Sequence, residues 1–326
     1  MGEYMFWAIR GGGGGSFGII VAWKLQLVPV PKTVTLYTVN RILEQNATKV
    51  VHKWQTIAHK LPMEFYSGIT FAPIDIDGHQ GTKKSVVASF HASFLSTIDD
   101  DLLPIMQEKF PELELLREDC TGMSWLQSIL YMGLLPNDTL NILLDRTYKN
   151  PLLSPSFKAK SDYVTEPIPE TAFEGIWERL LEKEAHSATI SLIAYGGIMD
   201  GIASSATPYP HRDGILYKIV YSLGWAVEDN ERWEWYVNWS RRLYNYMGPF
   251  VSKSPRRAYI SYRDVDIGRN DENGETSYEE ARVWGIKYFM DSFDKLARVK
   301  TMIDPDNFFR HEQSIPTLSS SSNMEL

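Results

Sequence analysis

Five consecutive glycines near the start of the chain, residues 11–15, constrain the fold more than any other feature of the sequence. Glycine has no Cβ, so its backbone can turn sharply and other groups can approach it closely. Together with Gly18, the run satisfies the G-x-G-x-x-G spacing of dinucleotide-binding folds. Those folds need a helix directly after the glycines, whereas the apolar, β-branched run over residues 16–30 predicts a strand. We therefore reject a nucleotide-dependent dehydrogenase. Two interpretations of the glycine run remain. Either two backbone segments pass close to each other there, or the absence of side chains lets the backbone approach a large flat cofactor.

Apolar periodicity predicts alternating strands and helices over most of the chain. The predicted strands cover residues 34–43, 65–71, 85–95, 188–195, 216–225 and 257–262. The predicted helices cover residues 47–61, 102–110, 124–132, 170–184, 228–246 and 278–301. The proline-punctuated stretch 137–160 is expected to be irregular. This order predicts an α+β fold, with an antiparallel sheet and helices on one face.

Composition excludes several classes of protein. The chain has 326 residues and a net charge of −8, with lysine and arginine spread along it, so we expect neither nucleic acid nor a membrane as partner. No apolar run is long enough to span a bilayer, and the start of the chain does not resemble a signal peptide. Cys120 is the only cysteine, and no group of residues has the spacing of a metal site.

Long stretches at both ends of the chain carry a family resemblance. Residues 2–24 read GEYMFWAIRGGGGGSFGIIVAWK, and residues 304–316 read DPDNFFRHEQSIP. Between them, residues 261–268 (SYRDVDIG), 195–199 (YGGIM) and 208–214 (PYPHRDG) also match. The chain resembles the plant berberine-bridge-enzyme-like FAD-linked oxidases, a family that includes cannabinoid synthases, monolignol oxidases and carbohydrate oxidases. The resemblance covers nearly the whole chain.

The resemblance implies a vanillyl-alcohol-oxidase type of fold, in which the chain leaves an FAD domain, builds a substrate domain and then returns. Residues 1–30 would end the FAD domain, residues 31–250 would form the substrate domain, and residues 251–316 would form the returning segment. Residues 317–326 are expected to be a disordered tail. Members of the family carry an upstream segment with the pyrophosphate loop and the covalent FAD attachment, which this chain lacks. The family is typically secreted or vacuolar, and the sequence does not settle the location of this chain.

The same resemblance implies roles for individual residues. Tyr262 would be the catalytic base, and Lys218 would be the cation that lowers the pKa of that tyrosine. The flavin contacts would come from Gly15, Gly18, Ile19, Ile20, Tyr259, Ser261 and His311. Relatives often have asparagine in place of Ser261 and His311, glutamine in place of Val220, and glycine in place of Met290.

The implied activity is hydride transfer from an alcohol, phenolic or carbohydrate substrate to FAD, with O₂ as the electron acceptor. The alternative is a shortened, non-catalytic paralogue or a fragment that cannot hold FAD alone. The sequence identifies neither the substrate nor the oligomeric state, and it does not decide between oxidase and dehydrogenase.

Overall fold

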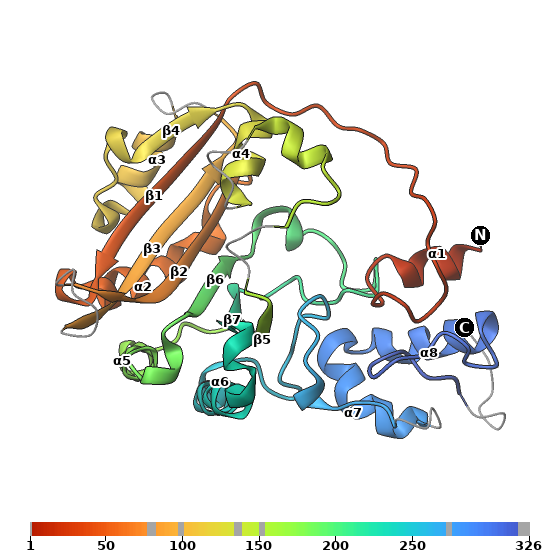
Figure 1. Ribbon diagram of the computed structural model, residues 1–326. Helices are drawn as coiled ribbons and strands as arrows, with labels where there is room; N and C mark the ends of the chain where they lie inside the picture. The colour runs from red at the N-terminus through yellow and green to blue at the C-terminus, as the bar shows by residue number, and fades with distance from the viewer. Residues whose placement is uncertain are drawn as a thin grey trace.

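One antiparallel sheet dominates the computed structural model, which describes residues 2–76, 83–96, 101–133, 139–149, 154–271 and 276–318. Its strands are β1 (Val34–Ile42), β2 (Phe65–Asp75), β3 (Lys84–Phe94), β4 (Cys120–Met123), β5 (Ser156–Val164), β6 (Ala188–Ala194) and β7 (Tyr217–Trp225). They lie side by side in the order β4-β1-β3-β2-β6-β7-β5 (Figure 1). Every described pairing in the sheet is antiparallel.

Several helices pack on one face of this sheet, and the first and last helices of the chain form a second group. They are α1 (Glu3–Ile9), α2 (Ala47–Ile57), α3 (Leu103–Lys109), α4 (Trp125–Met132), α5 (Glu170–Leu180), α6 (Trp233–Met247), α7 (Tyr278–Phe289) and α8 (Ser292–Ile303). Helices α2, α5 and α6 bury their apolar residues in one cluster with one face of the sheet. The predicted mixed fold of helices and an antiparallel sheet is confirmed.

The described residues pack into two hydrophobic clusters. The larger lies between the sheet and helices α2, α5 and α6, and includes Trp54, Phe71 and Trp177. The smaller joins α1 to α7 and α8, and includes Trp7 and Trp284. Both ends of the sequence therefore contribute to the second cluster, which lies beside β5 and α6 (Figure 1).

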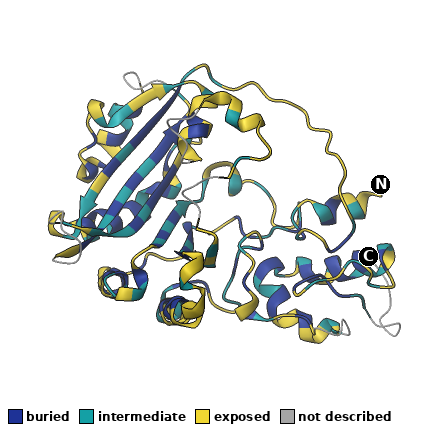
Figure 2. Cartoon of the chain, viewed as in Figure 1, coloured by how far each residue is buried: buried dark blue, intermediate teal, exposed yellow. Residues whose placement is uncertain are grey.

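The apolar run after the glycines is not the strand that its pattern predicts. Residues 16–30 pair with no other strand, and every residue from 21 to 30 is exposed, with Val21 94% and Leu27 91% accessible. In Figure 2 this segment is an exposed connection between α1 and β1. A strand forms only when another segment satisfies its backbone N–H and C=O groups. Periodicity alone cannot supply that partner.

Strand β5 contradicts the prediction of an irregular segment that extends to residue 160. Its sequence places Lys158, Lys160 and Asp162 at alternate positions, and this pattern of charges is unusual for a buried strand. Lys160 and Asp162 are nevertheless buried, because their ionic partners come from residues about 100 positions later in the sequence. The predicted strand at residues 257–262 is also absent. That segment is irregular and lies beside β5.

The long helix predicted over residues 278–301 is two helices, α7 and α8, separated by a turn at Met290. Met290 has φ 50° and ψ −132°, a conformation that side chains with a Cβ disfavour. Of the predicted disordered tail, only residues 317 and 318 lie among the described residues.

Replacing Met290 with glycine should raise the free energy of unfolding by about 1 kcal/mol, because a residue in such a region costs about 1–3 kcal/mol. Urea denaturation followed by tryptophan fluorescence measures this change. The matched control is Arg298→Gly, a partly exposed position in the middle of α8, where glycine should lower the stability by about 1 kcal/mol. If both variants were destabilised equally, Met290 would not be strained.

Candidate active site

The sheet face opposite the main hydrophobic cluster carries a row of side chains from six neighbouring strands. Strand register places these residues directly opposite one another in the order Thr38, His91, Gly68, Ile193, Lys218 and Tyr163. Alternation along each strand puts their sequence neighbours in the core on the other face. We call this side the site face. It is where the sheet can meet a ligand.

Lys218 lies beneath two tyrosines of the C-terminal segment. Its Nζ is 4.0 Å from the ring centroid of Tyr259 and 5.0 Å from that of Tyr262. The side chain is buried, and within the described residues Nζ has neither an ion-pair partner nor a hydrogen-bond acceptor. Burial lowers the pKa of the Lys218 amine to about 8, although the ring faces favour its cationic form. The structure therefore brings together the two residues expected to form the catalytic pair.

The electrostatics of Tyr262 differ from expectation. Burial raises the pKa of the Tyr262 phenol, and the neighbouring Tyr259 adds to this shift. The resemblance implied that Lys218 would lower this pKa. In the structure, the amine contacts the ring faces rather than the phenol oxygen, and its own charge is disfavoured by burial.

Four further tyrosines surround this pair, and the sequence analysis did not single them out. The hydroxyl of Tyr209 is 2.9 Å from that of Tyr163 and also bonds to that of Tyr195. The ring of Tyr209 packs edge-on against Tyr259 at 5.7 Å. Burial raises the pKa of Tyr66, and Tyr262 and Tyr195 add to the shift. Strand alternation could have placed Tyr66 and Tyr163 on the site face, but no local pattern brings the loop tyrosines to them.

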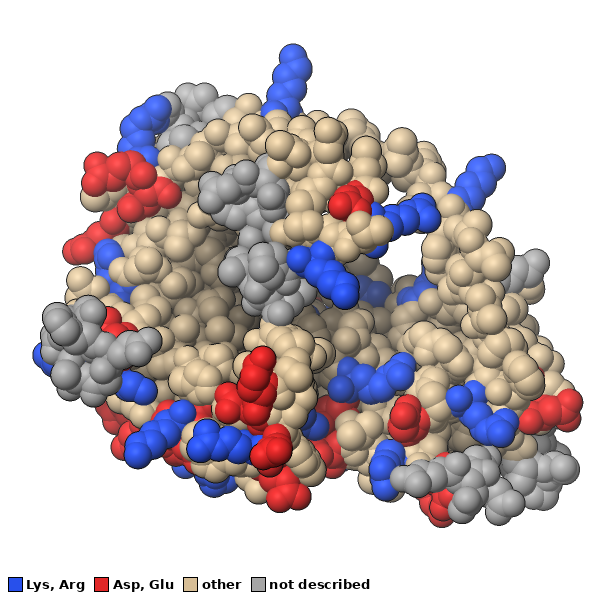
Figure 3. Space-filling model, in the orientation of Figure 1, with Lys and Arg blue, Asp and Glu red and all other residues tan. Residues whose placement is uncertain are grey.

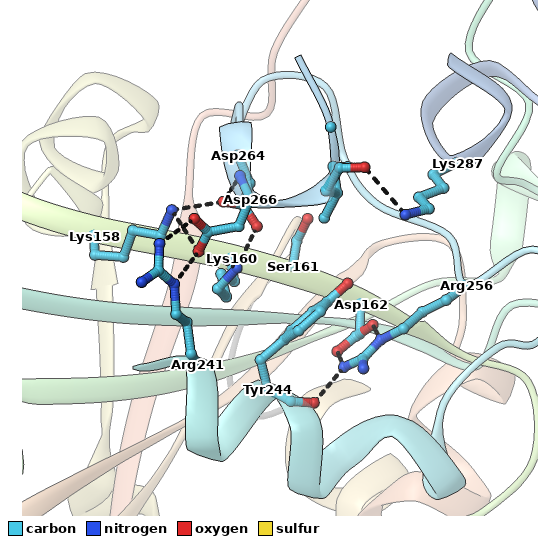
Figure 4. A network of polar contacts seen from close by, with 12 residues as sticks. Lys158, Lys160, Ser161, Asp162, Arg241, Tyr244, Arg256, Asp264, Asp266 and Lys287 are labelled. Carbon is cyan, nitrogen blue, oxygen red and sulfur yellow. Dashed lines mark hydrogen bonds and ion pairs between the residues drawn. The ribbon is translucent and has the colours of Figure 1, made fainter. Parts of the chain in front are cut away.

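Buried charges on β5 fix the segment that carries Tyr259 and Tyr262 (Figure 4). Before the tyrosines, Arg256 donates from Nε and Nη2 to the Asp162 carboxylate, at 2.7 and 2.6 Å. After them, Lys160 Nζ donates to Asp264 at 2.6 Å. Between these two anchors, the backbone N–H of Tyr259 donates to Ser161 Oγ at 2.8 Å. The segment is thus held at three points along one strand.

Asp266 extends this network to α6. Its carboxylate pairs with Lys158, Lys160 and Arg241. Burial alone would raise the pKa of Asp266, but hydrogen bonds from Arg241, Lys160 and Lys158 outweigh it and hold the pKa well below its usual range. Asp266 therefore stays ionised throughout the neutral pH range.

The glycine run forms a surface free of side chains next to the tyrosines. Gly13, Gly15 and Gly18 have φ values of 88°, 81° and 143°, which glycine adopts without strain. A cavity of about 240 Å³ is lined by the predicted flavin contacts Gly15, Gly18, Ile19, Ile20 and Ser261. The structure therefore brings these five residues together.

His311, another predicted flavin contact, lies at the edge of the glycine run. Its Nε2 donates to the Gly14 carbonyl oxygen at 3.1 Å, and its Nδ1 is 3.2 Å from Arg263 Nη1. Burial lowers the pKa of His311, and Arg263 lowers it further. The imidazole therefore supports the glycine backbone. It lines a different cavity, of about 390 Å³, together with Arg269 and Arg310.

A larger cavity of about 620 Å³ opens on the site face over β1, β2 and β3. Aliphatic and aromatic side chains make up much of its lining, with Tyr131 and Met132 contributed by α4. Tyr66 lies in this lining and is also close to Tyr262, so the cavity extends toward the tyrosines. Its size and lining suit a small organic ligand.

Comparison with known proteins identifies the family. The family model described as "Berberine and berberine like" matches residues 258–316. The chain is 46% identical to berberine bridge enzyme-like 24 of Arabidopsis thaliana, over 98% of this chain and 57% of that protein. It belongs to the berberine-bridge-enzyme-like family and corresponds to the C-terminal portion of its members.

Two other relatives agree with this assignment. Tetrahydroberberine oxidase of Berberis wilsoniae is 45% identical, over 98% of this chain and 58% of that protein. The solved structure of BBE-like #28 from Arabidopsis thaliana superposes with a TM-score of 0.89 at 42% identity, covering 98% of this chain and 63% of that one. The chain thus spans less than two thirds of the length of these relatives. Family members are FAD-linked oxidoreductases.

Three further properties concern the described part of the chain. Its helices are too short or too polar to cross a membrane. It brings together no group of three histidine, cysteine or acidic side chains that could hold a metal ion. Basic and acidic residues are interspersed over the face shown in Figure 3.

Removing the carboxylate charge in Asp162→Asn should lower the free energy of unfolding by about 3–5 kcal/mol, because it leaves a largely buried arginine without its counter-charge. Urea denaturation at pH 7 measures the effect. The control is Glu114→Gln, which breaks an ion pair whose acidic side chain is 79% exposed and should cost less than about 1 kcal/mol. Equal small losses in the two variants would show that the β5 network does not hold the segment.

Proposed function

We propose that this chain carries the substrate-binding surface and the proton-accepting residue of an FAD-linked oxidoreductase that oxidises an alcohol or phenolic substrate. The observation that supports this most strongly is the position of Tyr262, whose ring packs against the Lys218 amine while the preceding residue, Ser261, lines the cavity of the glycine run. In this proposal, residues 31–250 form the substrate domain. Residues 1–30 and 251–316 belong to the FAD domain.

The glycine run fits a large planar group. A Cβ added at Gly14 would meet no atom within 4 Å, so the space above that backbone is open. Ile19 and Ile20 are exposed beside it and offer apolar contacts, and Ser261 offers a hydroxyl. Gly15, Gly18, Ile19, Ile20, Ser261 and Tyr259 would hold the flavin, with His311 supporting the glycines. When bound, FAD accepts the hydride from the substrate and passes electrons to an acceptor, which we take to be O₂.

Tyr262 would accept the proton of the substrate hydroxyl at its phenol oxygen. An ordinary tyrosine has a pKa of about 10, and burial raises that of Tyr262 further. The phenolate therefore needs a nearby positive charge, and each pKa unit corresponds to about 1.4 kcal/mol. Lys218 supplies that charge when protonated. Since Nζ lies over the ring faces of both tyrosines, a shift of the amine toward the Tyr262 phenol oxygen would pair the two charges.

The lining of the site-face cavity favours an aromatic substrate over a sugar. Its walls include Leu36, Tyr66, Tyr131 and Met132, whereas a sugar needs many polar partners for its hydroxyl groups. Val220 lies on the same face, two residues after Lys218, and extends the apolar surface there.

A second candidate is a chain that folds as a scaffold without holding flavin. The exposed apolar residues between 19 and 30 favour it, because exposed apolar surface of this extent usually contacts another protein segment. Incubation with FAD followed by desalting distinguishes the two candidates. Retention of a perturbed flavin absorption band supports the oxidoreductase, whereas a colourless, soluble protein supports the scaffold.

In the FAD-loaded protein, Tyr262→Phe should slow flavin reduction by an aromatic alcohol about 10²–10⁴-fold, the usual contribution of a general base. Anaerobic stopped-flow bleaching of the flavin band measures the rate. Tyr246→Phe is the control, since the Tyr246 hydroxyl bonds to the Ala172 carbonyl on the helical side of the sheet. An unchanged rate in Tyr262→Phe would remove Tyr262 from the mechanism.

A further inference from the structure

His91 lies on the site face, and the packing of the main hydrophobic core does not require a histidine at this position. It is on β3, in the same cross-strand row as Lys218, and Gly68 and Ile193 lie between them. Its neighbours Phe90 and Ala92 are in the main core, so the imidazole is directed to the opposite side of the sheet. It lines the cavity of about 620 Å³.

Gly68 makes room for the His91 ring. A Cβ at Gly68 would lie 2.7 Å from His91 Nε2 and 2.9 Å from the Leu192 carbonyl oxygen, both closer than packed atoms allow. The imidazole of His91 therefore leans over Gly68, toward the Lys218 end of the row. No other residue type at position 68 would leave this space.

The hydrogen bonding of His91 leaves one nitrogen available to a ligand. Nδ1 is 3.3 Å from the Ser89 carbonyl oxygen, which can only accept, so Nδ1 carries the hydrogen. Burial lowers the pKa of His91, and the bond to Ser89 only partly opposes this effect, so the ring is neutral near pH 7. Nε2 is then a bare acceptor. Among the described residues it has no hydrogen-bond partner.

Strand geometry gives the distance from this acceptor to the catalytic pair. Neighbouring strands lie about 4.8 Å apart, so the two spacings from Gly68 to Lys218 amount to about 10 Å. Nε2 lies above Gly68 and therefore at about that distance from the Lys218 backbone. His91 lines its cavity together with Tyr66, and Tyr66 is close enough to Tyr262 to interact with it electrostatically.

We propose that His91 Nε2 accepts a hydrogen bond from a hydroxyl group at the end of the substrate remote from the carbon that is oxidised. This inference rests on the proposed function and assigns to His91 the selection of substrates that carry a second hydroxyl far from the oxidised carbon. The apolar walls hold the ring, His91 holds its distal hydroxyl, and the alcohol group lies at Tyr262.

The competing explanation is that His91 only fills the space above Gly68. A filling role needs the shape of the ring and not its nitrogen, so phenylalanine should replace it without consequence. A binding role needs the acceptor, so phenylalanine should remove the preference for ligands with a distal hydroxyl. Glutamine keeps an acceptor and should retain part of that preference.

Isothermal titration calorimetry of the protein with two matched ligands separates these explanations. The ligands are 4-hydroxycinnamyl alcohol and its 4-O-methyl ether, which differ in the distal hydrogen-bond donor. The wild-type protein should bind the hydroxy ligand about tenfold more tightly, because one hydrogen bond to a buried acceptor contributes about 1–1.5 kcal/mol. His91→Phe should reduce this ratio to about one. His52→Phe, the same exchange at a side chain of α2 that is 38% exposed, should leave it unchanged.

Gly68→Ala provides an independent variant in case His91→Phe does not fold. Its new methyl group would displace the imidazole and should also reduce the ratio, with folding checked by circular dichroism. A ratio that persists in His91→Phe or Gly68→Ala overturns the inference, and so does a wild-type protein that binds the two ligands equally or not at all.

The titration needs no flavin, so its result is separate from that of the oxidation assay. If the ratio depends on His91 but the FAD-loaded protein does not oxidise the alcohol, the binding inference stands and the proposed function fails. If oxidation occurs and the ratio does not depend on His91, only the inference fails.

Discussion

The ionic anchoring of the C-terminal segment on β5 is the interaction on which the rest of the site depends. Arg256 with Asp162 and Lys160 with Asp264 fix the segment on both sides of Tyr259 and Tyr262 (Figure 4). Buried ion pairs add little net stability, because the Coulomb attraction must first offset the cost of desolvation. Their strict geometry instead fixes where the segment lies. That placement closes the tyrosine rings over Lys218 and lowers its pKa.

Two surfaces that lack side chains give the site its shape. Gly68 opens a hollow in the sheet into which the His91 ring leans, and the glycine run lines a second cavity together with Ser261, the residue before Tyr262. Between them lie Lys218 and the tyrosines. A substrate on the sheet and a planar cofactor on the glycines could therefore both reach the Tyr262 phenol, which is the arrangement that a coupled proton and hydride transfer needs.

Local sequence patterns predicted most of the sheet and the helices, since burial on one face follows from alternation and amphipathic spacing. They failed where a distant partner decides the structure. Prolines in residues 137–160 predicted an irregular segment, whereas β5 forms from residue 156 and its buried charges find their partners Asp264 and Arg256 about 100 residues later. Residues 16–30 appeared to be a strand, although no described segment pairs with them. The proposed catalytic pair came from family resemblance, whereas strand register was needed to place His91 in the same row as Lys218.

The titration of Lys218 tests the central claim most directly, since the anchored segment is what buries the amine. The chemical shift of the lysine ε-carbon can be followed against pH in ¹³C-lysine-labelled protein, with Lys218→Arg to assign the signal. We predict a midpoint of about 8 in the wild-type protein and a rise toward the ordinary value of about 10.4 in Asp264→Asn. A midpoint near 10.4 in the wild-type protein would contradict the account.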